Sequence, residues 1–208
     1  MRNCKIFAHL NDYWRNYLLW RSSTSIANKF LLALTMSAIT GIFAQIKIYL
    51  PWTPVPITLQ TYAVFLSPLL LGLWWGVFSQ IVYVVLGVLG TPWFAGWKGG
   101  FMYIFAPTTG YLIGFIFAAL LFGYIVEKTT IMNRLLGRMG SYFTINFVGI
   151  YVPGLLILWI WYLKIGISLS LVELLKKGFL PFIIGDLSKL SPLIVVTRHE
   201  KSREPHAL

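Results

Sequence analysis

The segment from Pro51 to Tyr111 constrains the fold more than any other part of the chain. It holds two long apolar runs joined by Gly-rich and Trp-rich turns, then a Gly/Pro/Trp loop with a single lysine, and then a Pro-Thr-Thr-Gly turn. Apolar runs of this kind are typical of membrane spans. Irregular backbone at the end of a span is costly unless it lines a cavity or faces water. The segment therefore predicts a membrane protein with a shaped pocket near one face.

The composition extends this prediction to nearly the whole chain. Of 208 residues, 58% are hydrophobic and 11% are charged, whereas about 25% are charged in soluble domains. We expect one all-α integral membrane domain at 30–197, a basic amphipathic N-terminal segment at 1–29 and a basic cytoplasmic tail at 198–208. Cys4 is the only cysteine, which excludes an internal disulfide, and no cleavable signal peptide is expected at the N-terminus.

Hydropathy predicts six transmembrane helices, at residues 30–49, 57–72, 76–90, 108–126, 141–163 and 179–197. The second and third are short and are joined only by residues 73–75, so a tight hairpin is expected. Residues 5–20 have the spacing of an amphipathic helix that lies on the membrane surface. A mobile tail is the alternative for this segment.

The distribution of Lys and Arg predicts that both termini are cytoplasmic. One side of the six-helix topology carries Arg2, Lys5, Arg15, Arg21, Lys29, Lys128, Arg134, Arg138, Arg198, Lys201 and Arg203. The other side carries Lys47, Lys98, Lys164, Lys176 and Lys177. The net charge of +11 does not indicate nucleic-acid binding, because the basic residues lie in tails and loops between apolar segments. The loops at 50–57, 91–107 and 164–178 are then expected to face outward.

Asp186 and Lys189 form the strongest candidate for a binding site. They lie three positions apart in Gly-Asp-Leu-Ser-Lys and share one face of the predicted sixth helix. A charge within a span costs about 2.5–3.5 kcal/mol on insertion scales, so such residues usually face the bundle interior and mark substrate paths. An ion pair that only fixes helix packing is the alternative.

The outer loop from Thr91 to Pro107 is the second candidate. Trp93 and its aromatic neighbours suit an apolar lining, and Gly96 allows the backbone to approach a ligand closely. Lys98 is a lone cation among them. The alternatives are an interfacial aromatic belt for the aromatics and a solvated charge for Lys98.

Small residues recur every four positions in the first predicted helix, at Ala33, Ser37 and Gly41. Such a stripe lets two membrane helices approach closely. It faces either another helix of this chain or a partner protein. Gly110 and Gly114 form a similar pair, for which packing within the chain is favoured.

Catalytic and metal-binding patterns are absent from the sequence. His9, His199 and His206 all lie in the tails, and there is no paired-carboxylate pattern, metal-ligand spacing or P-loop. We therefore expect neither an enzyme nor a protein with a metal or cofactor.

Several segments together resemble the BioY family, the biotin-binding S components of energy-coupling-factor transporters. The matching segments are PVPITLQT at Pro54–Thr61, GVLGTPWFAG at Gly87–Gly96, Gly99-Gly100, APTTGYLIGF at Ala106–Phe115 and PFIIGDLSKL at Pro181–Leu190. They occur in order over about residues 30–195. The Asn that many members have near Gly96 is missing here.

The resemblance implies six helices with cytoplasmic termini and a biotin site near the outer face. It assigns ligand contacts to Asp186 and Lys189, to the loop Gly96–Gly100, and to the turn from Thr108 to Tyr111. Because Asp186 and Lys189 cancel in charge, Lys98 is the candidate for the biotin carboxylate, and aromatic walls such as Trp93 suit the apolar ring.

The resemblance also implies partners and a location. A transmembrane coupling protein with two ATPase subunits would dock on the small-residue stripe of the first helix, in a bacterial cytoplasmic membrane. Two alternatives remain open from the sequence: a subunit that binds another small vitamin-like molecule, and a membrane scaffold that transports nothing.

Overall fold

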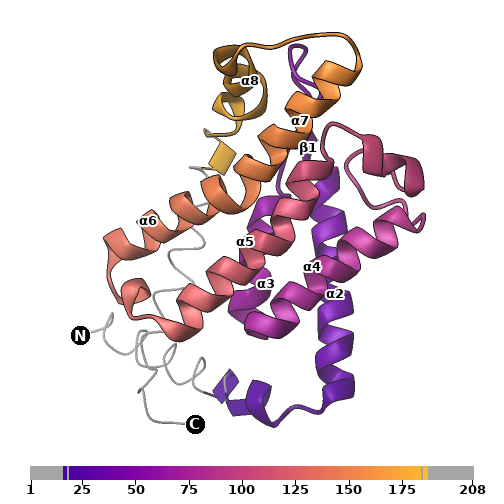
Figure 1. The fold of residues 1–208 in the computed structure, drawn as a ribbon. Helices are drawn as coiled ribbons and strands as arrows, with labels where there is room; N and C mark the ends of the chain where they lie inside the picture. Colours follow the sequence, from indigo (N-terminus) through magenta and orange to yellow (C-terminus); the bar gives the residue numbers. More distant parts are fainter. Residues whose placement is uncertain (1–15, 18, 184, 187–208) are drawn as a thin grey trace.

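The computed structural model describes residues 16, 17, 19–183, 185 and 186, and these form a bundle of apolar helices (Figure 1). The helices are α2 (Ile26–Gln45), α3 (Gln60–Leu71), α4 (Leu73–Val88), α5 (Thr109–Lys128), α6 (Leu135–Ile145), α7 (Val152–Lys164) and α8 (Leu171–Gly178). A π-helical segment, η3 (Asn146–Tyr151), joins α6 to α7 without a break. Helices α2 to α5 and the long α6–η3–α7 helix pack side by side, and α8 lies beyond the end of α7.

The connections at one end of the bundle contain short ordered elements. Strand β1 (Lys47–Ile48) pairs antiparallel with β2 (Ile57–Thr58), so that Lys47 lies opposite Thr58. The loop after α4 contains the 3-10 helix η1 (Phe101–Phe105), and a second one, η2 (Ile131–Asn133), precedes α6. Strands, η1 and α8 all lie towards the upper end of the bundle in Figure 1.

The lengths and composition of the helices fit a membrane protein. Within the described residues, 26–45, 109–128 and 135–164 are long and apolar enough to cross a membrane, and α3 and α4 are shorter apolar helices. Five of the predicted spans therefore coincide with helices. The sixth predicted span, at 179–197, lies mostly outside the described residues. Within its described part, residues 180–183, 185 and 186 are helical.

One helix start and one additional helix differ from the sequence prediction, each for a local reason. Helix α2 begins at Ile26 rather than at residue 30, because the Ser25 side chain accepts a hydrogen bond from the Asn28 backbone N–H and caps the helix. Helix α8 lies within the predicted outer loop at 164–178. Its capping box joins Ser170 and Glu173, a Ser-x-x-Glu pattern that marks a helix start.

The predicted hairpin of the second and third spans is tighter than expected. Only Gly72, with φ of +86°, separates α3 from α4. The Leu73 backbone N–H donates to Glu127 Oε1 at 3.0 Å, and Arg21 Nη2 lies 3.8 Å from the same carboxylate oxygen. The turn is thus held by α5 and by the segment that precedes α2.

The small-residue stripe of α2 packs inside the chain. Ala33 and Ser37 are fully buried, and the Ser37 hydroxyl donates to the Ser79 carbonyl of α4 at 2.6 Å. A methyl group at Gly41 would lie 2.8 Å from the Trp93 Cβ. The stripe therefore packs within the chain, as the intrachain alternative expects, and docking of a partner protein on α2 stays a prediction.

A substitution in this stripe tests the packing. Ser37→Leu places a larger side chain against α4 and removes the hydrogen bond to Ser79, and overpacking of this kind costs about 1–3 kcal/mol. We expect a clearly lower midpoint of thermal unfolding in detergent. Ala38→Leu is the matched control, because Ala38 is the next residue and is exposed. Equal stability of the two variants would contradict the buried position of the stripe.

Candidate ligand-binding site

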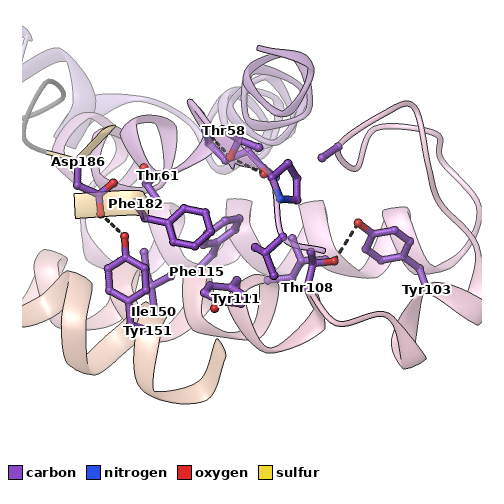
Figure 2. A pocket seen from close by; sticks show the side chains of 15 residues that line it. Thr58, Thr61, Tyr103, Thr108, Tyr111, Phe115, Ile150, Tyr151, Phe182 and Asp186 are labelled. Carbon is purple, nitrogen blue, oxygen red and sulfur yellow. Dashed lines mark hydrogen bonds between the residues drawn. The ribbon is translucent and has the colours of Figure 1, made fainter. Parts of the chain in front are cut away.

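A pocket opens near the end of the bundle where the strands and η1 lie (Figure 2). Its lining comes from β2 and the loop before it, from the loop after α4 and from η1, from α3, from α5 and its N-cap, from η3, and from the segment after α8. The lining residues are Val55, Pro56, Thr58, Gln60, Thr61, Ala95, Tyr103, Thr108, Tyr111, Leu112, Phe115, Ile150, Tyr151, Phe182 and Asp186. Among these described lining residues, Asp186 carries the only carboxyl group, and none is a Lys, Arg or His.

Asp186 forms one end of the pocket and is held by two side chains of η3. It is 3% exposed, and its Oδ2 accepts hydrogen bonds from Asn146 Nδ2 at 2.6 Å and from the Tyr151 hydroxyl. Hydrogen bonds to a carboxylate are among the strong ones in proteins. Together they fix the orientation of a buried acceptor that faces the pocket.

The π-helical segment is the reason that Asn146 and Tyr151 reach the same carboxylate. In a regular α-helix, residues five positions apart differ by roughly 140° in direction, at 3.6 residues per turn. The wider π turn brings such residues onto one face. Pro153 is the second residue of α7 and cannot donate the backbone hydrogen bond that a regular α-helix would make to Gly149. The sequence pattern predicts neither residue, because a regular helical period places them on different faces.

The opposite end of the pocket carries hydroxyl groups. Figure 2 shows Tyr103 and Thr108 far from Asp186, with the Thr108 hydroxyl donating to the Tyr103 oxygen at 3.0 Å. Burial raises the pKa of Tyr103, so its phenol is protonated at neutral pH. A phenolic O–H that accepts from Thr108 still has its own hydrogen to donate. This end can therefore donate hydrogen bonds to an acceptor group of a ligand.

Apolar side chains fill the space between the two polar ends. Phe115, Ile150 and Phe182 form much of this middle section, and Leu112 and Tyr111 lie beside them. Ligand pockets usually have mostly apolar walls and a few placed polar groups. The lining fits a small molecule of the same character.

The structure brings three of the predicted ligand contacts together. Asp186, Thr108 and Tyr111 all line the pocket, and the Tyr111 hydroxyl donates to the Gly178 carbonyl at 2.8 Å, which ties α5 to the end of α8. Lys189 lies outside the described residues. Trp93, Gly96 and Lys98 are not among the lining residues, although Ala95 of the same loop is.

Trp93 packs against α4. Its indole Nε1 donates to the Tyr83 carbonyl at 2.9 Å, and its ring lies 5.3 Å from the Tyr83 ring. The side chain thus anchors the loop to α4. Gly96 has a φ of +83°, and a methyl group there would lie 2.8 Å from the Tyr49 hydroxyl, so glycine is required by the turn.

Gln45, at the end of α2, organises this loop and was not predicted. Its Nε2 lies within hydrogen-bond distance of the carbonyls of Trp93 (3.2 Å) and Phe94 (3.1 Å), and its Oε1 accepts from the backbone N–H groups of Gly96 (3.2 Å) and Trp97 (3.1 Å). One amide side chain therefore satisfies several backbone groups of a tight turn. No local pattern in the sequence marks it, because its partners lie about fifty positions further along the chain.

We expect Gln45→Met to weaken ligand binding without unfolding the chain. Methionine keeps the length of the side chain but leaves the loop's backbone groups without their partners, and each such bond contributes roughly 0.5–1.5 kcal/mol. Gln45→Glu keeps the two accepted bonds and should lie between methionine and the wild type. Affinity measured by calorimetry checks the order, and unchanged affinity in both variants would show that the clamp does not shape the site.

Within the described part of the chain, no group of three or more His, Cys, Asp or Glu side chains is placed to hold a metal ion. A bundle of apolar helices with a mostly apolar pocket and one buried carboxylate defines a membrane protein that binds a small molecule. The chain belongs to the BioY family, whose family model matches residues 16–205.

Individual relatives agree with this assignment. A probable biotin transporter BioY from Methanothermobacter thermautotrophicus is 41% identical over 142 residues, which cover 68% of this chain and 90% of the relative. The biotin transporter BioY of Thermotoga maritima is 36% identical over 160 residues, 76% of this chain and 87% of the relative. The crystal structure of the S-component for biotin from an ECF-type ABC transporter has a TM-score of 0.71, covers 88% of this chain and 96% of its own, and is 24% identical. It supports the fold.

Proposed function

We propose that the chain is a membrane subunit that binds biotin and mediates its uptake, and that it catalyses no reaction. The observation that carries the proposal is the order of chemical groups along the pocket: the buried Asp186 carboxylate, an apolar middle, then the hydroxyls of Tyr103 and Thr108. The relatives at 41% and 36% identity carry the name of biotin transporter, which supports the same ligand.

Biotin offers matching groups in the same order. Its ureido ring carries two N–H donors, which suit the carboxylate of Asp186. Its thiophane ring is apolar and suits the side chains of Phe115, Ile150 and Phe182. Its chain ends in a carboxylate, which suits the hydroxyl end. Lys189 is proposed to bind the ureido carbonyl, Thr108 and Tyr111 to border the ligand, and Lys98, beside Gly96, to attract the carboxylate.

Accumulation of a solute against its gradient requires an energy source, and the chain's sequence carries no P-loop. The structural relative is an S-component of an ECF-type ABC transporter. We therefore propose that a transmembrane coupling protein with two ATPase subunits energises this chain when present. The proposed setting is the cytoplasmic membrane of a bacterium, with six spans and both termini on the cytoplasmic side.

An uptake assay tests the proposal. The chain is expressed in cells that lack high-affinity biotin uptake, and accumulation of labelled biotin is measured with and without a coupling module. We expect accumulation above the empty-vector level that excess unlabelled biotin abolishes. Absence of accumulation under both conditions, with the chain present in the membrane, would contradict the proposed function.

A further inference from the structure

Two lysines converge on Gly96, next to the hydroxyl end of the pocket. A methyl group placed on Gly96 would lie 3.3 Å from Lys47 Nζ and 3.9 Å from Lys98 Cε. Lys47 comes from β1, where it pairs with Thr58, a lining residue of the pocket. Lys98 comes from the loop that contributes Ala95 to the same lining. The Lys47 ammonium and the Lys98 side chain thus both lie near Gly96, and their segments each contribute a residue to the pocket lining.

The backbone around Lys98 is fixed, so its position does not depend on a free loop. Phe94 and Lys98 exchange two backbone hydrogen bonds, at 2.9 and 3.3 Å. Trp97 has a φ of +58°, a conformation that residues other than glycine rarely adopt and that clusters at functional sites. The Gln45 side chain binds the same turn from α2. This backbone is therefore preorganised.

The lysine pair also has no carboxylate to neutralise it among the described residues. Glu127 lies near Arg21 and the α3–α4 turn, Glu173 caps α8, and Asp186 lies at the far end of the pocket. Lys47 Nζ instead lies 5.5 Å from the centre of the Tyr49 ring. Two positively charged side chains that lie near one point repel each other, and an anion bound beside them relieves the repulsion.

Lys177, another lysine of the predicted outer side, is already engaged. Lys177 lies beside a second hollow formed with Trp52 and Leu180. Its ammonium donates to the Trp52 carbonyl at 2.9 Å and lies 5.7 Å from the centre of the Tyr162 ring. The pair at Gly96 is therefore the better placed anion site, and it adjoins the Tyr103 and Thr108 end of the pocket.

We propose that Lys47, together with Lys98, forms a two-lysine site that binds the carboxylate of the ligand and selects it over uncharged analogues. This inference rests on the proposed function, because the site lies at the end of the same pocket. Lys47 is the residue that this inference adds to the proposed site, and it determines specificity for a charged ligand. Lys98 is exposed and Lys47 is half-buried, so raised ionic strength should weaken the binding of an acid more than that of its neutral amide.

The test compares biotin with the uncharged biotin amide by calorimetry on purified full-length chain. We expect Lys47→Ala to lower the affinity for biotin about tenfold and to leave the affinity for the amide unchanged. Lys47→Arg, which keeps the charge, should restore most of the loss. The variant with both Lys47→Ala and Lys98→Ala should lose the discrimination between the ligands. Lys176→Ala, an exposed lysine on α8, is the matched control.

Equal losses for biotin and its amide in Lys47→Ala, or no loss for either, would overturn the two-lysine site while leaving biotin binding by the wild type intact. Failure of the wild type to bind biotin would instead overturn the proposed function. Thermal unfolding of each variant in the same detergent identifies any loss of affinity that comes from misfolding. If Lys47→Ala is misfolded, the affinity of Lys47→Gln and the salt dependence of wild-type binding test the two-lysine site instead.

Discussion

Asp186→Asn should weaken biotin binding by well over tenfold while the chain stays folded. The amide that replaces the second carboxylate oxygen is a hydrogen-bond donor and faces the N–H donors of the ureido ring. Asn146 Nδ2 and the Tyr151 hydroxyl can still donate to the remaining oxygen, so the packing is kept. Removing one partner of a buried charged hydrogen bond typically costs about 2–5 kcal/mol in affinity.

Glu173→Gln is the control for the loss of one negative charge. Glu173 lies on α8, is fully exposed and does not line the pocket. Hydrogen bonds from the Ser170 side chain and backbone lower the pKa of Glu173, so it is ionised at neutral pH and the substitution removes the same unit charge. Calorimetry should find wild-type affinity for this variant. A folded Asp186→Asn chain with unaltered affinity would remove Asp186 from the site.

Gly114→Ala should destabilise the fold by about 1–3 kcal/mol, the usual cost of overpacking. A methyl group at Gly114 would lie 2.7 Å from the Gly149 carbonyl oxygen and 2.8 Å from the Ile150 Cα. Both are backbone atoms of η3, so no side-chain rotation relieves the overlap, and α5 must move away from η3. A loss of this size corresponds to roughly 2–4 °C per kcal/mol in the unfolding midpoint for a chain of this length.

Gly140→Ala provides the matched control on α6. A methyl group added there has no atom within 4 Å, and alanine favours a helix over glycine. Its midpoint should equal or exceed that of the wild type. If Gly114→Ala unfolds at the wild-type temperature, the close approach of α5 and η3 is not present in the protein.

Some parts of this site were predictable because their signals are local. Asp186 stands out as a charge in an apolar run, and the turn at Thr108–Tyr111 stands out by its Pro, Thr and Gly residues. Both lie at the pocket. The pairing of Gly110 and Gly114 with other helices of the chain was also predicted and is confirmed, since both are buried against the η3–α7 helix.

Other parts depend on geometry that a sequence pattern does not contain. Asn146 and Tyr151 share a face only because the helix widens to a π turn between them. Gln45 and Lys47 lie next to a loop about fifty residues away in the sequence. The packing of α2 against α4 decides which of these long-range contacts form. The stripe on α2 shows the same limit: small residues indicate a close approach, but not which partner approaches.

The central claim, that this pocket holds biotin, is tested most directly by titrating biotin into the purified, detergent-solubilised chain in a calorimeter. We expect saturable binding at a single site, with Asp186→Asn as the variant that abolishes most of the heat and Glu173→Gln as the one that preserves it. Absence of heat and of any shift in the unfolding midpoint at high biotin concentration, in a wild-type preparation shown to be folded and free of bound biotin, would contradict it.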